Sequence, residues 1–240
     1  MSAINLVKIF DFDVTCYTDL NDASDDIINN RLEQSCIAVA INPEKIVTAY
    51  EDKNTYNALN VADLRYLDGI GTVKLAQKRL GKTVNRIPGC ELWQELMLKA
   101  SSRKVPIYIL GATSDVVNKT VTKLKTEYGA NIVGYHDGFF DNDDDMINEI
   151  LSCNPKILTV ALGSPRQEIF MDKCKACGVN AFMMGVGGTY NVFTGNAKRA
   201  PKVWCDLGLE WLYRLLCEPS RIFRQFKLLK FISLAIRKKI

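Results

Sequence analysis

Residues 157–188 read ILTVALGSPRQEIFMDKCKACGVNAFMMGVGG, and this stretch decides the fold. An apolar run at 157–163 ends in glycine, residues 165–177 have the composition of a helix, and a second apolar run at 180–188 ends in a glycine-rich turn. Short apolar runs bounded by glycine are typical of strands that are buried on both faces. The order strand, helix, strand predicts a parallel βαβ unit with a right-handed crossover.

The same alternation extends back to about residue 36. We expect strands at 36–42, 64–67, 105–111 and 131–138, and helices from Glu44, at 72–80, at 93–101, at 114–128 and at 143–152. Residues 4–17 indicate a strand or hairpin, and residues 21–33 a helix with Ser24 as its N-cap. The sequence therefore predicts a Rossmann-like α/β domain over residues 1–197, with a mostly parallel sheet and helices on both faces.

The remaining residues, 198–240, differ in composition and are expected to form a C-terminal helical appendage. Residues 221–240 carry seven bases and no acid, whereas residues 1–220 carry 24 bases and 27 acids. Apolar and basic side chains alternate with helical periodicity: Ile222, Phe223, Phe226 and Leu229 share one face, and Arg221, Arg224 and Lys227 the other. This pattern predicts contact with an anionic membrane surface rather than with nucleic acid. Basic residues could bind either partner, but the large aliphatic residues between them favour lipid. A helix packed on the body is the alternative. No uncharged apolar run is long enough to span a bilayer.

Three of the expected strands end in glycine, at Gly111, at Gly163 and at Gly185–Gly188. Open α/β sheets bind ligands beyond the carboxyl ends of their strands, where glycine lets a phosphate approach the backbone. The dinucleotide fingerprint and the P-loop pattern are both missing from the sequence, so neither of those nucleotide sites is expected.

Two polar residues at expected strand ends have both a structural and a functional interpretation. Asp68 precedes Gly69 and forms an ordinary turn, or it is a carboxylate general base at the end of strand 64–67. Gln167 completes a capping box with Ser164 at the N-cap and Pro165 at N1, or it faces a ligand.

Other features are less specific. The basic run from Lys198 and Arg199 to Lys202 is a solvated loop or a diphosphate clamp, and Arg214 pairs with Glu210 on a helix surface or binds a ligand. Asp11-Phe-Asp13 has the form of a metal motif of some sugar transferases, but an exposed strand face explains it as well. The eight cysteines are expected to be reduced, and the lone Cys174-Lys-Ala-Cys177 pair to be inert.

Taken together, LGSPRQEIFM, GVGGTYNVFTGNAKRAP and LGLEWLYRLLCEPSRIFRQ resemble the signature of the bacterial WecG/TagA/CpsF glycosyltransferases, and the spacing to ADLRYLDGIG agrees with it. The resemblance covers nearly the whole chain. The stretches AINPEK, GCELWQELM, NIVGYHDGFF and MGVGGTYNVFTG are most similar to the members that transfer N-acetyl-D-mannosaminuronic acid in enterobacterial common antigen synthesis.

This resemblance implies an inverting transfer without metal or other cofactor. The donor would be a UDP-activated N-acetylmannosamine-type sugar, here the uronic acid, and the acceptor GlcNAc-diphosphate-undecaprenol at the cytoplasmic face of the bacterial inner membrane. The alternatives are a transferase of neutral N-acetylmannosamine, as in teichoic acid linkage synthesis, and a non-catalytic membrane-bound UDP-binding module. Self-association as a homo-oligomer is compatible with the sequence.

The resemblance also assigns residues. Asp68 would be the general base on the acceptor hydroxyl. The substrate-binding residues would be Asn42, Arg86, Gln167, Gly187, Arg199, Arg214, Arg221 and Arg224, of which the last three would close over the diphosphate. Many relatives have threonine where this chain has Ala40, which indicates different donor contacts. Lys198 or Arg199 would bind the donor carboxylate.

Overall fold

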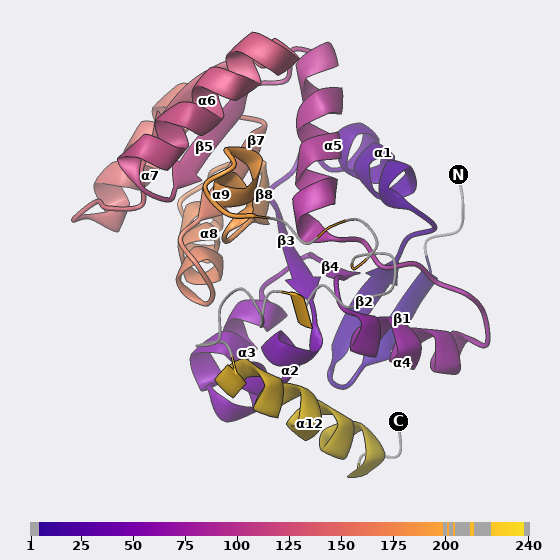
Figure 1. Ribbon diagram of the computed structural model, residues 1–240. Helices are drawn as coiled ribbons and strands as arrows, with labels where there is room; N and C mark the ends of the chain where they lie inside the picture. Colours follow the sequence, from indigo (N-terminus) through magenta and orange to yellow (C-terminus); the bar gives the residue numbers. More distant parts are fainter. Residues whose placement is uncertain (1–4, 199–200, 202–203, 205–211, 214–221, 238–240) are drawn as a thin grey trace.

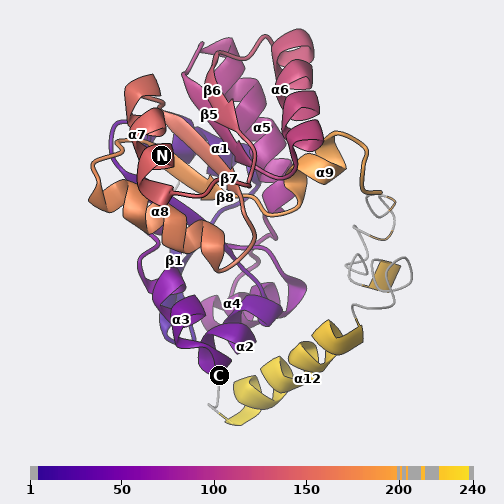
Figure 2. The same cartoon turned by 90° about the vertical axis from the view of Figure 1, so that its left-hand side faces the viewer.

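The computed structural model describes residues 5–198, 201, 204, 212–213 and 222–237. Figures 1 and 2 show these residues as one layered α/β arrangement, with the last helix lying beside α2. The strands are β1 (Asn5–Ile9), β2 (Phe12–Cys16), β3 (Cys36–Ile41), β4 (Leu64–Leu67), β5 (Ile107–Gly111), β6 (Ile132–His136), β7 (Ile157–Ala161) and β8 (Phe182–Gly185). The helices are α1 (Leu20–Asn30), α2 (Pro43–Glu51), α3 (Lys53–Asn60), α4 (Ile70–Leu80), α5 (Gly89–Ser102), α6 (Ser114–Tyr128), α7 (Asp143–Cys153), α8 (Arg166–Ala176), α9 (Thr189–Phe193) and α12 (Ile222–Arg237).

The eight strands form one sheet in the order β1-β2-β4-β3-β8-β7-β5-β6. The β1–β2 hairpin is antiparallel, and every other described pair is parallel. The predicted mostly parallel sheet is therefore confirmed. The central strands are buried on both faces, which explains why they appear in the sequence as continuous apolar runs.

Two hydrophobic cores cover the two faces of the sheet. One contains residues of α2, α3, α4, α7 and α8, and the other residues of α1, α5, α6 and α9. The prediction of helices on both faces is confirmed. The short helices α3 and α9 were not predicted, because neither is long enough to show a helical period. Helix α5 begins at Gly89, earlier than predicted, and α1 is capped by Asp19, whose Oδ1 accepts the Asp22 N–H at 2.8 Å, and not by the buried Ser24.

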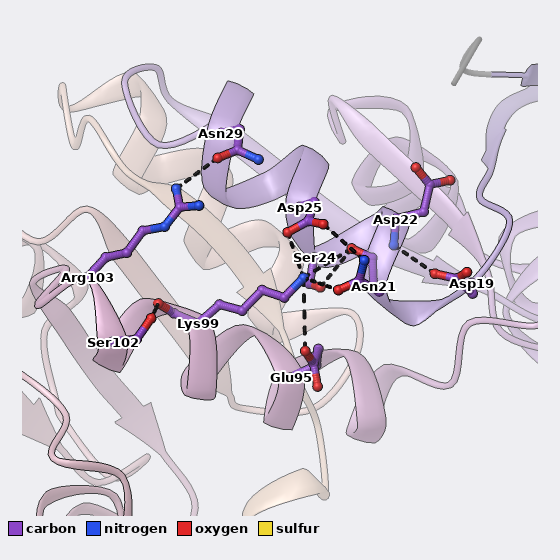
Figure 3. Close-up of polar contacts among 10 residues, drawn as sticks. All are labelled: Asp19, Asn21, Asp22, Ser24, Asp25, Asn29, Glu95, Lys99, Ser102 and Arg103. Carbon is purple, nitrogen blue, oxygen red and sulfur yellow. Dashed lines mark hydrogen bonds and ion pairs between the residues drawn. The ribbon is translucent and has the colours of Figure 1, made fainter. Parts of the chain in front are cut away.

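Helix α5 is fixed to α1 by a polar cluster centred on Lys99 (Figure 3). Its Nζ donates to Asn21 Oδ1 and pairs with Asp25 Oδ1, both at 2.6 Å, and its own-helix partner Glu95 lies 3.9 Å away. The buried neighbours Trp93, Leu96 and Met97 hold the same helix against the sheet. Because α5 is held along its length, its N-terminal residue Gly89 occupies a fixed place at the edge of the sheet.

Helix α12 packs on the body through one aromatic side chain. Phe231 is 3% exposed and lies against Gly71 of α4 and edge-on to Phe10, at a ring-centroid distance of 5.6 Å. Lys227 donates to Thr48 Oγ1 at 2.6 Å. Among the described residues no helix has the length and hydropathy needed to cross a bilayer. The division of the chain at residues 197 and 198 stays a prediction.

Two basic residues of α12 contact the body of the protein. Lys227 donates to Thr48 of α2, and Lys230 pairs with Glu51 at the end of the same helix. Seven of the described side chains of α12 are exposed, and four of these are large apolar residues: Phe226, Leu229, Ile232 and Ile236. Two of the bases that were expected to meet a membrane therefore also form contacts with the protein itself.

Candidate active site

The sheet brings the ends of β4 and β3 together. These strands are parallel and adjacent, with Ile41 in register with Leu67, so the residues that follow them, Asn42 and Asp68, are neighbours at the same edge. The backbone N–H of Asp68 donates to Ile41 O at 2.9 Å and extends the pairing by one residue. Two predicted site residues that are 26 positions apart in the sequence are thus brought side by side.

Gly69 is required for this close approach. A Cβ at Gly69 would stand 2.6 Å from Pro43 Cδ and 3.1 Å from Asn42 Cβ, which is too close for any side chain. The chain can turn from β4 into α4 against the start of α2 because residue 69 has no Cβ. The Asp-Gly dipeptide therefore serves a structural purpose and also places the Asp68 carboxylate.

Two donors orient the Asp68 carboxylate. Arg86 Nε and Nη2 both lie 3.1 Å from Oδ1, and the N–H of Gly89 donates to Oδ2 at 3.1 Å. Helix α5 has no side-chain cap from its own N-cap residue, Pro88, so Asp68 serves as a cap from another part of the chain. Both contacts stabilise the anionic carboxylate, and its side chain remains 20% exposed.

Asn42 is the N-cap of α2. Its Oδ1 accepts the N–H of Lys45 at 2.8 Å, and Pro43 occupies the first helical position, as predicted. The cap fixes the carbonyl end of the side-chain amide towards the helix. The Nδ2 group is the part of Asn42 that suits a substrate oxygen, and contact with substrate stays a prediction.

A buried ion pair links this edge to the next pair of strands. Lys45 Nζ lies 2.9 Å from Glu168 Oε1, with side-chain exposures of 14% and 0%. Burial by itself raises the pKa of Glu168, but the charge and hydrogen bond of Lys45 together with hydrogen bonds from Gln167 and Ser164 outweigh burial, and the net effect is a lowered pKa. Glu168 is therefore ionised at neutral pH, and the pair ties the start of α2 to the start of α8.

Gln167 is 3% exposed, and its amide is used within the protein. Its Oε1 accepts the N–H of Gly187 at 3.1 Å, and its Nε2 donates to Glu168 Oε1 at 3.0 Å. The capping-box interpretation is wrong, because α8 has Pro165 at its N-cap and no side-chain cap bond. Gln167 instead fixes the turn after β8 that contains Gly187. Direct contact of Gln167 or Gly187 with substrate stays a prediction.

The predicted basic residues lie mostly outside the described residues. Arg199, Arg214 and Arg221 are not described, and for Arg224 only its place in α12 is known. Lys198 is exposed at the end of the continuous described stretch. The structure thus brings together Asp68, Arg86 and Asn42 at one pair of strand ends, and Gln167 and Gly187 at the next.

Sequence reasoning missed three residues of this arrangement. Lys45 and Glu168 are 123 positions apart, so no local pattern connects them. Gly89 is the first residue of α5, in a stretch whose strongest sequence signal is the apolar helix that follows. The one sequence signal for Glu168 was its position directly after Gln167, a candidate ligand-binding residue.

The Asp11-Phe-Asp13 motif lies away from this site. Asp11 is in the turn before β2, and because β2 is parallel to β4 this turn is at the opposite edge of the sheet from Asp68. Asp11 accepts a hydrogen bond from Tyr50. In the part of the chain that the structure describes, no group of three or more acidic, His or Cys side chains could hold a metal ion. Burial raises the pKa of Cys174 to about 12, which keeps this thiol protonated.

Comparison with known protein families gives one result. The family model described as the glycosyl transferase WecG/TagA/CpsF family matches residues 7–240. The match includes strands β2 to β8, the residues at the strand ends (Asn42, Asp68, Arg86, Gln167 and Gly187) and α12. It includes the segment between α9 and α12 that holds the predicted arginines.

The Lys45–Glu168 pair leads to a pH-dependent stability prediction. Lys45→Met leaves a buried carboxylate without its cation, which should lower the free energy of unfolding at pH 7 by about 3–5 kcal/mol. In the wild type the pair contributes fully to the free energy of unfolding above the ordinary Glu pKa of 4.5. This contribution is lost as the pH falls through the lowered pKa of Glu168 in the folded protein. In the variant the hydrogen bond from Gln167 remains but the charge of Lys45 is lost, so burial raises the Glu168 pKa relative to wild type. Protonation then relieves the penalty, and the difference in stability from wild type should shrink between pH 8 and pH 5. Denaturant unfolding across this range measures it.

Lys119→Met is the matched control. Lys119 pairs with Asp115 at 2.8 Å, but the side chains are 55% and 63% exposed. Its loss should change the free energy of unfolding by less than about 0.5 kcal/mol at every pH. An effect of Lys45→Met as small as this, or one that does not vary with pH, would contradict the structural role of the buried pair.

Proposed function

The chain belongs to the WecG/TagA/CpsF family of glycosyltransferases, and from this premise we propose that it transfers N-acetyl-D-mannosaminuronic acid from UDP to GlcNAc-diphosphate-undecaprenol. The family gives the general class of the reaction, a sugar transfer. The observation that carries the mechanism is the Asp68 carboxylate at the end of β4, held by Arg86 and the N-terminus of α5 beside Asn42.

In this proposal Asp68 is the general base. The acceptor GlcNAc hydroxyl gives its proton to an Asp68 carboxylate oxygen while the hydroxyl oxygen attacks the anomeric carbon of the donor sugar. The bond from that carbon to the UDP oxygen breaks, UDP leaves with the electron pair, and the configuration inverts. One base is enough for an inverting transfer, since no covalent enzyme intermediate has to form. Arg86 and Gly89 orient the carboxylate for this step.

The leaving diphosphate needs positive charge. Arg199, Arg214, Arg221 and Arg224 are the proposed source, because arginine binds phosphate oxygens through paired, charge-assisted hydrogen bonds. The uronic acid adds a carboxylate, for which Lys198 or Arg199 is proposed. Asn42 and Gln167 are proposed to contact the sugars, the second in addition to its internal bonds.

Two other functions remain as alternatives. A transferase of neutral N-acetylmannosamine would use the same base and acceptor, and would differ in needing no cation for the donor carboxylate. A non-catalytic UDP-binding module would bind the nucleotide and transfer nothing. Family membership favours catalysis, and the oriented Asp68 is a feature that a binding module has no need of.

We also propose that the protein acts at the cytoplasmic face of the bacterial inner membrane. The support is the outward face of α12, on which Phe226, Leu229, Ile232 and Ile236 are between 47% and 72% exposed. The exposed apolar stripe suits shallow insertion among lipid headgroups, and the bases near the chain end suit an anionic leaflet. Membrane contact would bring the site to its lipid-linked acceptor.

Asp68→Asn tests the base. The amide keeps the shape of the carboxylate but cannot take the proton, so the transfer rate should fall about 10²- to 10⁴-fold while UDP-sugar binding is retained. Steady-state transfer to a GlcNAc-diphosphate lipid measures the rate, and calorimetry measures the binding. Near-normal turnover would remove Asp68 from the mechanism.

Comparing two donors tests the substrate. The UDP-linked uronic acid should be used with a higher kcat/KM than neutral UDP-N-acetylmannosamine with the same lipid acceptor. A preference for the neutral sugar would establish the first alternative instead. Binding of UDP without transfer from either donor would establish the second.

Leu229→Glu with Ile236→Glu tests the membrane contact. Two acids on the exposed stripe should lower binding to phosphatidylglycerol-containing vesicles at least tenfold, because they remove apolar contact and are repelled by the surface. Sedimentation with vesicles measures it. The matched control places the same acids on an exposed helical surface of the body, at Lys119 and Thr126 of α6, and should bind as the wild type does. Equal vesicle binding by all three proteins would rule out this face of α12.

A further inference from the structure

Tyr66 has a buried hydroxyl without a partner beside the proposed base. It lies on β4 two residues before Asp68 and is 0% exposed. Its Oη is one of the few buried side-chain nitrogen and oxygen atoms among the described residues that have no hydrogen-bond partner. Leaving such a group unpaired costs stability, so its presence needs a reason.

The other buried tyrosines of the described chain are all satisfied. The hydroxyl of Tyr17 donates to Asp26 Oδ2 at 2.6 Å, and that of Tyr108 donates to Glu149 Oε1 at 2.5 Å. The hydroxyl of Tyr190 forms a hydrogen bond with Thr159 Oγ1 at 2.6 Å. Burial therefore does not by itself leave a tyrosine unpaired in this fold. Tyr66 is the exception, and it is also the one that lies next to Asp68.

The position of Gly89 locates the two oxygens relative to each other. A Cβ at Gly89 would stand 3.1 Å from Tyr66 Oη and 3.4 Å from Asp68 Oδ2. Both oxygens thus flank the first residue of α5, whose N–H is already bonded to Asp68. The Tyr66 hydroxyl and Asp68 Oδ2, an oxygen of the carboxylate that would receive the proton, therefore both lie beside Gly89.

Ala40 lies beside Tyr66 in the sheet. Ala40 is the register partner of Tyr66 on the neighbouring strand β3, so the two side chains lie on the same face. Every other residue of β3 is buried, but Ala40 is only partly so, and it is thus the most exposed position of the strand beside Tyr66.

The electrostatics decide what kind of atom the hydroxyl can meet. Burial, and after it the carboxylates of Asp68 and Glu168, raise the pKa of Tyr66 well above its usual value, so the hydroxyl stays protonated and can donate. The same two carboxylates disfavour a further anion at this point. A neutral oxygen is the acceptor that suits the position.

We propose that Tyr66 is a substrate-binding residue, whose hydroxyl donates a hydrogen bond to a neutral oxygen of a bound sugar next to Asp68. That oxygen is a ring hydroxyl or the carbonyl of an N-acetyl group, and it belongs to the donor or to the acceptor sugar. The inference rests on the proposed glycosyl transfer. In the free enzyme the Tyr66 hydroxyl has no acceptor, and in the complex the substrate oxygen is its acceptor.

Tyr66→Phe is the test, because it removes the hydroxyl and keeps the ring. Without substrate the variant should have an unchanged or higher Tm, since no hydrogen bond is lost. In the transfer assay the KM of one sugar substrate should rise roughly threefold to tenfold with kcat unchanged, because the bond is present in both the bound substrate and the transition state. A rise in the donor KM assigns the oxygen to the donor, and a rise in the acceptor KM assigns it to the acceptor sugar.

Tyr190→Phe is the matched control. Tyr190 is equally buried, but its hydroxyl bonds to Thr159, so this variant should have a lower Tm and unchanged KM values. The inference fails if Tyr66→Phe leaves both KM values unchanged, or lowers Tm as much as Tyr190→Phe does. It also fails if the effect is confined to the uronic acid donor, since the oxygen would then be the carboxylate. A wild-type protein that transfers no sugar would overturn the proposed function itself, which distinguishes the two failures.

Discussion

The parallel pairing of β4, β3, β8 and β7 at the centre of the sheet is the constraint on which the rest of the structure depends. Parallel strands that are buried on both faces need helices above and below, and each crossover returns the chain to the same edge. All carboxyl ends therefore meet there. Asn42, Asp68 and Gly187 are placed near one another by this pairing, and not by any pattern in their own local sequence.

This arrangement places two carboxylates where they are partly or fully buried, and each is stabilised by hydrogen-bond donors or cations from distant segments. Asp68 is held by Arg86 and by the first N–H of α5, and Glu168 by Lys45 of α2. The Gly89 contact fixes the start of α5 at the end of β4, and the Lys45–Glu168 pair fixes the start of α2 relative to the start of α8. The Tyr66 hydroxyl departs from this rule, and unsatisfied buried groups of this kind are expected where a ligand completes the set.

Helix α12 shows how the same residues change meaning once their neighbours are known. On a helical wheel its bases and its apolar residues form two opposite faces, which suggests that charge leads the contact with a membrane. In the structure Phe231 inserts against α4, while Lys227 and Lys230 pair with α2. Four large apolar side chains of α12 are left exposed, so insertion of apolar side chains joins charge in the proposed membrane contact.

The sequence by itself determined the α/β class and six strand segments in nearly the right places, and the other two strands lie within the stretch 4–17 that was predicted as a strand or hairpin. It did so because buried parallel strands are continuous apolar runs and their helices are amphipathic. It also determined the candidate residues Asp68, Asn42 and Gln167, through their positions at strand ends and through family resemblance. Only the tertiary structure decided what these side chains touch. The Lys45–Glu168 pair, the cap that Asp68 gives to α5 and the unpaired hydroxyl of Tyr66 each join segments between 21 and 123 residues apart or depend on burial, and a linear pattern carries no record of such contacts.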